Sequence, residues 1–270
     1  MNNDSPIKAV LVVVLVALVC SSLVSAAVVI LRPIQLNNQL LDRSMNIVRL
    51  SGLLTAGSEL PDEEILSLFK SLDARVVDID SAAFEPDIDP YTFDKRRAAN
   101  NPEFSVAIPS EFDHTGMGRR SRLAPAFLVW QVDEIERIIL PIRGNGMWSA
   151  LYGYIALEPD MNTIADVVFY EQNETPGLGD QITGPDWLAQ WQGKRIYDEQ
   201  GEVRFAVSGG RVDDTSPSAA FEVDALTGAT VTADAVTGLV RYWLGPHGYQ
   251  LFLEHLREQP PGRPIPAKDS

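Results

Sequence analysis

The sequence is poor in the side chains that bind metals or form covalent cross-links. Its 270 residues include one cysteine and three histidines. A zinc site built on cysteines, an iron–sulfur cluster and an internal disulfide all need more cysteines than that, so the count excludes them. The single cysteine, Cys20, lies in an apolar run, where an inert thiol is expected.

Positive charge is also scarce. The chain has 22 Lys and Arg against 37 Asp and Glu, a formal net charge of −15 at pH 7. Proteins that bind nucleic acids present basic surfaces to the phosphates, so we expect no nucleic-acid partner. The length permits one large domain or two small ones with a sizeable core.

One long stretch carries no charge at all. Residues 9–31 form an apolar run of 23 residues between Lys8 and Arg32. As a helix it would be about 34 Å long, enough to cross a hydrocarbon core of about 30 Å. Val24-Ser25-Ala26 resembles a signal-peptidase site, but the apolar run continues beyond it, which favours an uncleaved single anchor. The few flanking basic residues leave the orientation open.

The remaining pattern predicts an α+β fold in which helices flank a mainly antiparallel sheet. A helix near the membrane is expected from the apolar stripe of Leu36, Leu40, Ile47 and Leu54. A second helix is expected after Pro61, with acidic residues 62–64 in its first turn and an apolar face of Ile65, Leu68, Phe69 and Leu72. Two more helices are expected at 184–194 and 247–256. Strands are expected at 126–132, 136–142, 150–157, 167–170 and 203–207. Turns at 144–146 and 158–160 favour antiparallel neighbours.

These patterns divide the chain into five segments. They are a tail over 1–8, a transmembrane helix over 9–31, a membrane-proximal helical and irregular region over 32–125, a domain core over 126–257, and a Pro-rich, solvated tail over 258–270. Within the irregular region, Gly116 to Arg120 is predicted to be a basic solvated loop and His114 a surface histidine. Trp187 and Trp191, four residues apart, are predicted to pack in the core or to form a docking face, not to clamp a cofactor.

A polar turn followed by an amphipathic helix is the most informative stretch. The helix face consists of Val236, Leu239, Val240, Trp243 and Leu244. Thr232 is the predicted N-cap, with Asp234 in the first turn. Thr230 would then lie just ahead of a helix N-terminus, where free backbone N–H groups favour phosphate. A capped turn without a ligand is the alternative interpretation.

The turn itself reads Asp224-Ala225-Leu226-Thr227-Gly228-Ala229-Thr230. It resembles the pattern Asp-x-x-(Ser/Thr)-Gly-Ala-Thr of the NqrC family, which belongs to the Na⁺-translocating NADH:quinone reductase, and of the related RnfG family of the Rnf complex. In these proteins a flavin transferase esterifies FMN phosphate onto the last threonine, here Thr230. The resemblance thus implies one covalent FMN, with Asp224, Thr227, Gly228 and Ala229 completing the motif.

Two further runs resemble the NqrC family, namely Gly144 to Tyr154 and Glu171 to Gly179. Neither matches a dinucleotide or nucleotide-triphosphate glycine loop. An isoalloxazine ring needs apolar walls and a few polar groups at its pyrimidine edge. We expect Trp148 and Leu178 to supply walls, and Glu174, Thr175 and backbone N–H groups near Gly177 to supply edge contacts. Departures are Thr227 and Ala233 where serine is commoner, and Gln172 in place of histidine.

The resemblance implies a function for the whole chain. The 126–257 core would be an FMN-binding domain that relays electrons, without an NADH site of its own, in a complex that reduces quinone and exports Na⁺. The partners would be the other subunits, a flavin transferase and membrane lipid, at the bacterial inner membrane with the C-terminal domain in the periplasm. Alternatives are the RnfG component of an Rnf-type complex, a non-catalytic envelope scaffold, or a membrane-anchored hydrolase, which would need His114, His247 or His255 as its base.

Overall fold

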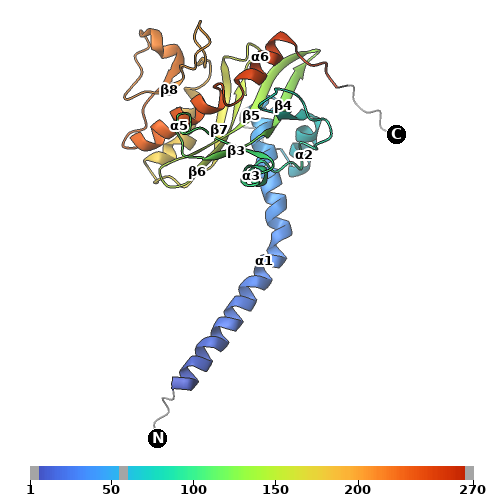
Figure 1. Ribbon diagram of the computed structural model, residues 1–270, viewed down its shortest axis with the longest axis vertical. Coiled ribbons are helices and arrows are strands. Elements are labelled where there is room, and N and C mark those ends of the chain that lie inside the picture. The colour runs from blue at the N-terminus through green and yellow to red at the C-terminus, as the bar shows by residue number, and fades with distance from the viewer. Residues whose placement is uncertain (1–5, 55–59, 265–270) are drawn as a thin grey trace, which may run out of the picture. The chain divides into compact units, whose positions relative to one another are not determined.

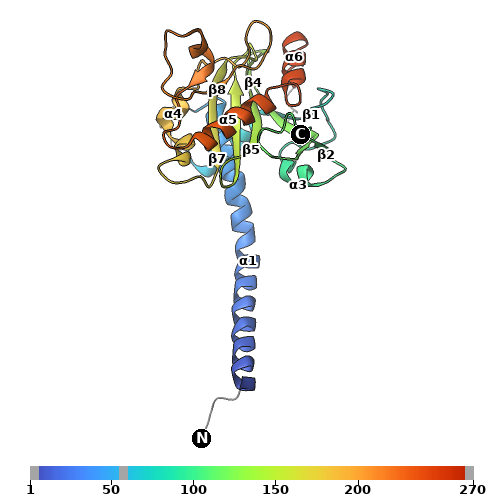
Figure 2. The ribbon, with the colours of Figure 1, turned by 60° about the vertical axis from the view of Figure 1, so that its left-hand side comes forward.

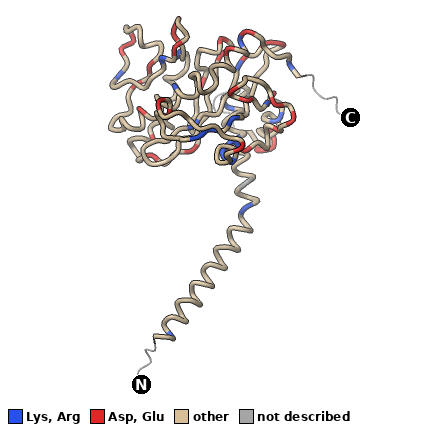
Figure 3. The backbone as a smooth tube through the Cα atoms, viewed as in Figure 1, with Lys and Arg blue, Asp and Glu red and all other residues tan. Residues whose placement is uncertain are grey.

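The computed structural model describes residues 6–54 and 60–264 (Figure 1). The chain divides between Met45 and Asn46 into two compact units. The first consists of most of helix α1 (Pro6–Leu50), the one helix among the described residues that is long and apolar enough to span a membrane. Its uncharged stretch from residue 9 to residue 31 is plain in Figure 3.

Helix α1 continues without a break past the predicted transmembrane segment and ends at Leu50. Ile47 is buried, as the predicted stripe requires, and Leu40 is 38% exposed. Leu54 lies beyond the end of the helix, and the side chain of Leu36 lies outside the described residues. A second helix, α2 (Asp62–Ser71), follows Pro61 and buries Ile65 and Phe69, which confirms that prediction.

The second unit is built on a five-stranded antiparallel sheet in the order β1-β4-β5-β6-β7. Its strands are β1 (Asp73–Asp78), β4 (Leu123–Gln131), β5 (Glu134–Asn145), β6 (Ala150–Leu157) and β7 (Ile164–Glu171). Four of them match the strands predicted between residues 126 and 170, and a turn follows β6 at 158–160 as predicted. The turn expected at 144–146 lies instead at 146–149, because Gly144 and Asn145 still belong to β5 and pair with Leu151 and Ala150. The fold class is therefore confirmed as α+β.

Both faces of the sheet are covered. Helix α5 (Thr230–Trp243) lies across one face, as Figure 2 shows, and α6 (Gln250–Glu258) follows it. This face carries the larger core, into which Ile138, Leu140 and Ile155 of the strands project. The opposite face packs Phe127 and Ile139 against Ile47 at the end of α1 and against Phe69 of α2.

Smaller elements connect these layers. They are α3 (Lys95–Asn100), β2 (Ser105–Ala107), β3 (Arg119–Ser121), η1 (Gly179–Thr183), α4 (Pro185–Ala189), β8 (Ala206–Val207), η2 (Pro217–Phe221) and β9 (Glu222–Val223). The predicted core role of Trp187 and Trp191 is confirmed, since their rings pack 5.5 Å apart and both are buried. Helix α6 begins later than predicted because residues 245–249 form turns.

The region before residue 126 contributes a strand to the sheet, and one prediction about its loops was wrong. Strand β1 pairs with β4 in register Val76↔Pro125, so the sheet begins well before the expected boundary of its domain. Arg119 and Arg120, expected in a solvated loop, belong to strand β3 (Arg119–Ser121), and Arg120 is 5% exposed. At 203–207 only Ala206–Val207 forms a strand, because Phe205 turns into the core against Trp191 at 4.4 Å.

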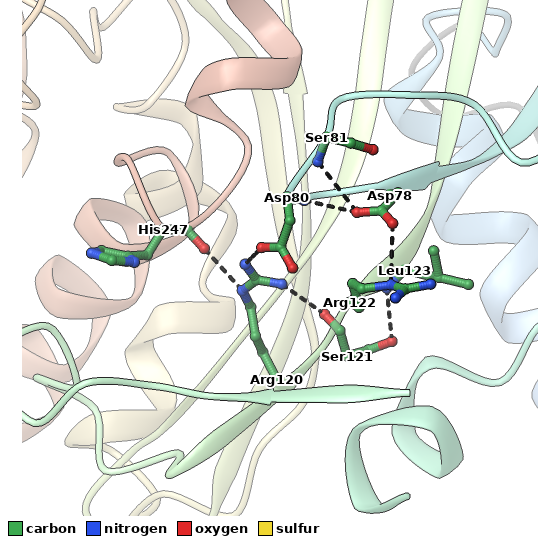
Figure 4. A network of polar contacts seen from close by, with 8 residues as sticks. All are labelled: Asp78, Asp80, Ser81, Arg120, Ser121, Arg122, Leu123 and His247. Atoms are coloured by element: carbon green, nitrogen blue, oxygen red, sulfur yellow. Dashed lines mark hydrogen bonds and ion pairs between the residues drawn. The ribbon is translucent and has the colours of Figure 1, made fainter. Parts of the chain in front are cut away.

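Ion pairs hold this irregular region together (Figure 4). The guanidinium of Arg120 contacts the carboxylate of Asp80 and donates to the carbonyl oxygen of His247 at 2.9 Å. Arg122 pairs with Asp78 at 3.1 Å, and the Asp78 carboxylate also accepts from the backbone N–H of Asp80 at 2.9 Å. A buried arginine is tolerated because its charge is paired and its donors are bonded.

Side chains replace a missing strand along one edge of β5. The pairing of β4 with β5 ends at Phe127↔Ile139, so later residues of β5 pair with no strand on that side within the described part of the chain. The carbonyl oxygen of Pro141 accepts from Lys95 Nζ at 3.0 Å and from the Tyr249 hydroxyl at 2.8 Å. Burial raises the pKa of Tyr249 well above its usual value, so this hydroxyl keeps its proton.

The side-chain nitrogen Nζ of Lys95 lies 3.6 Å from the ring centroid of Trp243. Burial lowers the pKa of Lys95 well below 10.5, and the charges of Arg143 and Arg120 lower it further. The unfolded chain then binds more protons than the folded chain between that lowered pKa and about 10.5. In this window the free energy of unfolding of the wild type rises with pH.

We predict that Lys95→Met removes this rise. Urea unfolding of the full chain in detergent, measured at several pH values from 7 to about 9.5, should show a wild-type advantage over Lys95→Met that grows with pH. The upper limit stays below the ordinary tyrosine pKa of 10.0. Lys70→Met, at the exposed end of α2, is the control and should follow the wild-type profile. Parallel profiles for wild type and Lys95→Met would contradict the prediction.

Candidate functional site

Three loops that sequence analysis singled out converge beside the N-terminus of α5. They are the β5–β6 hairpin at 144–149, the segment 171–179 after β7, and the turn 224–230. The carboxylate of Glu174, which is 4% exposed, joins the first two of them to the first turn of α5. It accepts from the backbone N–H of Trp148 at 3.1 Å, from that of Met147 at 3.3 Å, and from the Thr232 hydroxyl at 2.5 Å. We call these three hydrogen bonds the Glu174 bridge.

Two glycines leave the space that the Glu174 bridge occupies. A Cβ on Gly146 would lie 2.5 Å from Oε1 of Glu174. A Cβ on Gly179 would lie 2.8 Å from both Cβ of Glu174 and Oγ1 of Thr232. Real Cβ atoms do not approach other atoms so closely, so the loops can meet only because both positions lack a side chain.

Helix α5 begins three residues earlier than predicted. Its first residue is Thr230, and its N-cap is Ala229, which has no capping side chain. The predicted N-cap, Thr232, is instead a buried residue of the first turn, because its hydroxyl donates to Glu174. Asp234 accordingly lies outside the first turn, which contains no acidic residue. The prediction failed because a tertiary hydrogen bond outweighs the local capping preference.

Thr230 has the environment that an anionic substituent needs. It is exposed, and among the residues that the structure describes no hydrogen-bond partner is found for its hydroxyl group. The first helical hydrogen bond in α5 runs from Ala233 N to Ala229 O at 3.0 Å. The backbone N–H groups of residues 230–232 therefore precede the helical ladder, at the positive end of the helix dipole.

The turn before Thr230 depends on Gly228. This residue has φ +75°, and a Cβ there would lie 2.9 Å from Cδ2 of Leu178. The side-chain amide of Gln181 donates to the carbonyl oxygens of Leu178 at 2.7 Å and Thr227 at 3.2 Å. The 171–179 segment and the Thr227–Thr230 turn are thereby held side by side, and Thr227 itself is exposed.

Apolar side chains around Thr230 are open to solvent. The exposed fractions are 66% for Trp148, 54% for Val231, 52% for Met147 and 40% for Leu178. The indole Nε1 of Trp148 donates to the Thr175 hydroxyl at 3.0 Å, which fixes the orientation of the ring. Exposed apolar side chains gathered in this way are typical of a binding surface.

The predicted polar contacts are engaged within the protein. The Glu174 carboxylate faces the protein interior, and Thr175 orients Trp148. Asp224 accepts from Val212 N at 2.7 Å, and its own backbone groups bond Gln190 and Trp187, each at 2.9 Å. Asp224 therefore secures the base of the turn. Gly177, at φ +76°, has open space around it.

Other kinds of site find little support. Among the described residues, no group of three or more His, Cys, Asp or Glu side chains could hold a metal ion. The ring of His247 packs on Phe112 with centroids 4.0 Å apart, and His114 lies beside Gly238 of α5. Within the described part of the chain no histidine bonds Thr230, so the imidazole–threonine pair that a hydrolase would need is not found there.

Sequence reasoning missed Gly146, Gly179, Gln181 and Thr232 as parts of the site. Gly146 and Gly179 lie inside the motif runs, but only the three-dimensional contact with Glu174 gives them a role. Thr232 lies 58 residues from Glu174 along the chain, and no local pattern signals that contact.

An apolar N-terminal helix precedes a domain built on an antiparallel sheet, in which an exposed threonine begins a helix. These features describe a class of α+β proteins with one candidate membrane anchor and a binding surface at a helix N-terminus. Residues 146–245 match the FMN-binding domain family, and this span contains most of the site. NqrC of the Na⁺-translocating NADH-quinone reductase of Pseudomonas aeruginosa is 40% identical over 258 residues, which cover 95% of this chain and 98% of that protein. The Yersinia pestis NqrC is 38% identical, with 95% of each chain covered.

Solved structures agree with these sequence matches. The crystal structure of Shewanella oneidensis NqrC superimposes with a TM-score of 0.73 at 32% identity, covering 83% of this chain and 98% of that one. The corresponding protein of Parabacteroides distasonis gives a TM-score of 0.61 at 26% identity, covering 83% of this chain and 96% of that one. The chain belongs to the NqrC family of the Na⁺-translocating NADH-quinone reductase.

We predict that Gly228→Ala destabilises the folded chain by about 1–2 kcal/mol, the usual strain of a left-handed conformation for an L-residue. Its Cβ would also displace Leu178. Gly209→Ala is the matched control, because a Cβ there meets no atom within 4 Å and φ is not positive. Urea unfolding should separate the two variants. Equal stability of both would show that the 228 turn relaxes without cost.

Proposed function

We propose that this chain is the flavin-carrying subunit of a membrane NADH:quinone reductase and relays electrons through one FMN esterified to Thr230. The observation that carries the proposal is the exposed Thr230 hydroxyl, without a partner among the described residues, at the first position of a 14-residue helix. The match of residues 146–245 to the FMN-binding domain family supports the cofactor. The NqrC relatives support the complex in preference to an Rnf-type assembly or a scaffold.

The residues around Thr230 fit a flavin phosphate. Backbone N–H groups of Thr230, Val231 and Thr232 would face the phosphate, and the helix dipole would favour its charge. Trp148 and Leu178 would contact the ring system, and N–H groups near Gly177 would reach its polar edge. FMN supplies the redox chemistry, while the chain fixes its position and solvent access.

Attachment requires a flavin donor whose phosphate carries a leaving group, such as the nucleotide part of a flavin dinucleotide. A bond forms between Thr230 Oγ1 and phosphorus, the bond from phosphorus to the leaving group breaks, and the hydroxyl proton is lost to a base. A separate flavin transferase would supply that base. This chain would present an exposed hydroxyl at the first residue of α5.

The remaining assignments complete the proposal. Residues 9–31 of α1 would anchor the chain in lipid of the bacterial inner membrane, with the second unit in the periplasm. Other subunits would oxidise NADH and reduce quinone. They would also export Na⁺, since the one candidate span among the described residues carries no charged residue between Lys8 and Arg32. The five-segment division, including a core over 126–257, is kept as part of the proposal with β1 added to the sheet.

We predict that Thr230→Val, which replaces the hydroxyl with a methyl group, abolishes flavin attachment, and that Thr230→Ser retains it. The full chain would be expressed with and without the flavin transferase. In-gel flavin fluorescence of the denatured chain and the mass of the peptide containing residue 230 are the measurements. A fluorescent Thr230→Val chain would move the attachment elsewhere, and an unmodified wild-type peptide despite active transferase would overturn the covalent assignment.

A further inference from the structure

Glu174 is the carboxylate that joins the loops of the site, and its surroundings differ from those of a cofactor ligand. Its side chain is 4% exposed, although Trp148 and Leu178 nearby are 66% and 40% exposed. Both carboxylate oxygens accept hydrogen bonds from the protein itself. A flavin edge contact would need the carboxylate to face the open surface.

The donors to Glu174 come from opposite sides of the site. Met147 and Trp148 belong to the β5–β6 hairpin, and Thr232 belongs to the first turn of α5, two residues after Thr230. A buried carboxylate demands such donors, because burying a charge without hydrogen bonds is costly. Hairpin and helix are thereby held at a fixed separation.

The backbone of Glu174 is held as firmly as its side chain. Its N–H donates to the side-chain oxygen of Gln172 at 2.6 Å. Gly146 and Gly179 surround the carboxylate so closely that a Cβ at either position would come within 3.0 Å of Glu174 atoms. The first turn of α5 also contributes its positive dipole end to the carboxylate.

We propose that Glu174 is a positioning residue, whose buried carboxylate sets the separation between the Trp148 wall and the Thr230 attachment point, and that it is not a ligand of the flavin ring. The statement about the flavin ring rests on the proposed function, whereas the statement about the separation of the hairpin and α5 does not. The proposal replaces the expectation that Glu174 contacts the pyrimidine edge. The Glu174 bridge itself is a property of the chain without cofactor.

The first test uses the flavin-free full chain in detergent, on a Thr230→Val background. Glu174→Gln leaves one carbonyl oxygen for three donors, so the amides of Met147 and Trp148 lose protection. Hydrogen exchange of these amides should become about 10-fold faster or more, since hydrogen bonds to charged groups are among the stronger ones. Glu171→Gln is the matched control, because its exposed carboxylate pairs with Arg96 at the end of β7. It should leave exchange at residues 147 and 148 unchanged.

A second pair of variants distinguishes the loss of one hydrogen bond from a general loss of folding. Thr232→Val removes one donor of the Glu174 bridge and keeps the side-chain shape, and Thr232→Ser keeps the hydroxyl. Thr232→Val should speed exchange at 147 and 148 in the flavin-free chain, and Thr232→Ser should restore wild-type rates. Wild-type rates in Thr232→Val would overturn the proposal, because the hydroxyl would then contribute nothing to the hairpin.

The flavin-loaded chain provides the third measurement. Loss of a buried negative charge beside the site should move the flavin midpoint potential to more positive values in Glu174→Gln, because reduction adds negative charge to the ring. Glu171→Gln should leave it nearer the wild-type value. Trp148 should also become more mobile, seen as lower tryptophan fluorescence anisotropy relative to Glu171→Gln.

The outcomes separate the two proposals. If Glu174→Gln shifts the potential but leaves amide exchange at 147 and 148 at wild-type rates, Glu174 acts on the flavin directly and the positioning role is wrong. If residue 230 carries no flavin in the wild type, the proposed function fails. The exchange measurements then still decide whether the Glu174 bridge joins the hairpin to α5.

Discussion

The position of every group in the site depends on how closely α5 can approach the sheet. Gly144 of β5 lies beneath Leu239, and a Cβ at Gly144 would come within 3.1 Å of that side chain. Gly238 of α5 likewise allows the helix to lie close to the loop at Thr115, because a Cβ at Gly238 would lie 3.3 Å from the threonine methyl group. Close packing of this kind leaves no freedom for the helix to slide. The first turn of α5 is therefore carried to Glu174, and Thr230 to the open side of the site.

The elements that sequence patterns can predict are those with regular apolar spacing. Strands β4 to β7 and helix α5 have it, and the structure contains all of them. Strand β1 reads Asp-Ala-Arg-Val-Val-Asp, and β3 is only Arg-Arg-Ser, so neither shows the apolar alternation of a strand. Their charges are neutralised by pairs such as Arg120 with Asp80, which join residues 40 positions apart. Such pairing is a tertiary contact, so it cannot be predicted from a short stretch of sequence.

The site is predictable to the extent that it is local. The turn at 224–230, the exposed hairpin tryptophan and the glycine turn at 177–179 all follow from short motifs, and the structure brings them together. How they are joined does not follow from those motifs. Thr232 has the sequence context of an N-cap, yet its hydroxyl is bound by a carboxylate 58 residues away. Glu174 likewise has the sequence context of a surface ligand, and only the folded chain shows that it is buried.

The openness of the site bears on why a flavin would be covalently attached here. Sites that hold small molecules by contacts alone usually bury about 70–90% of the ligand's surface. Here the expected walls, Trp148 and Leu178, are themselves 66% and 40% exposed, so they can cover only part of a ring system. A shallow site of this kind gives weak binding and rapid dissociation, because little apolar area leaves water. The proposed ester bond to Thr230 would remove the need for deep burial and would leave the ring accessible to a redox partner.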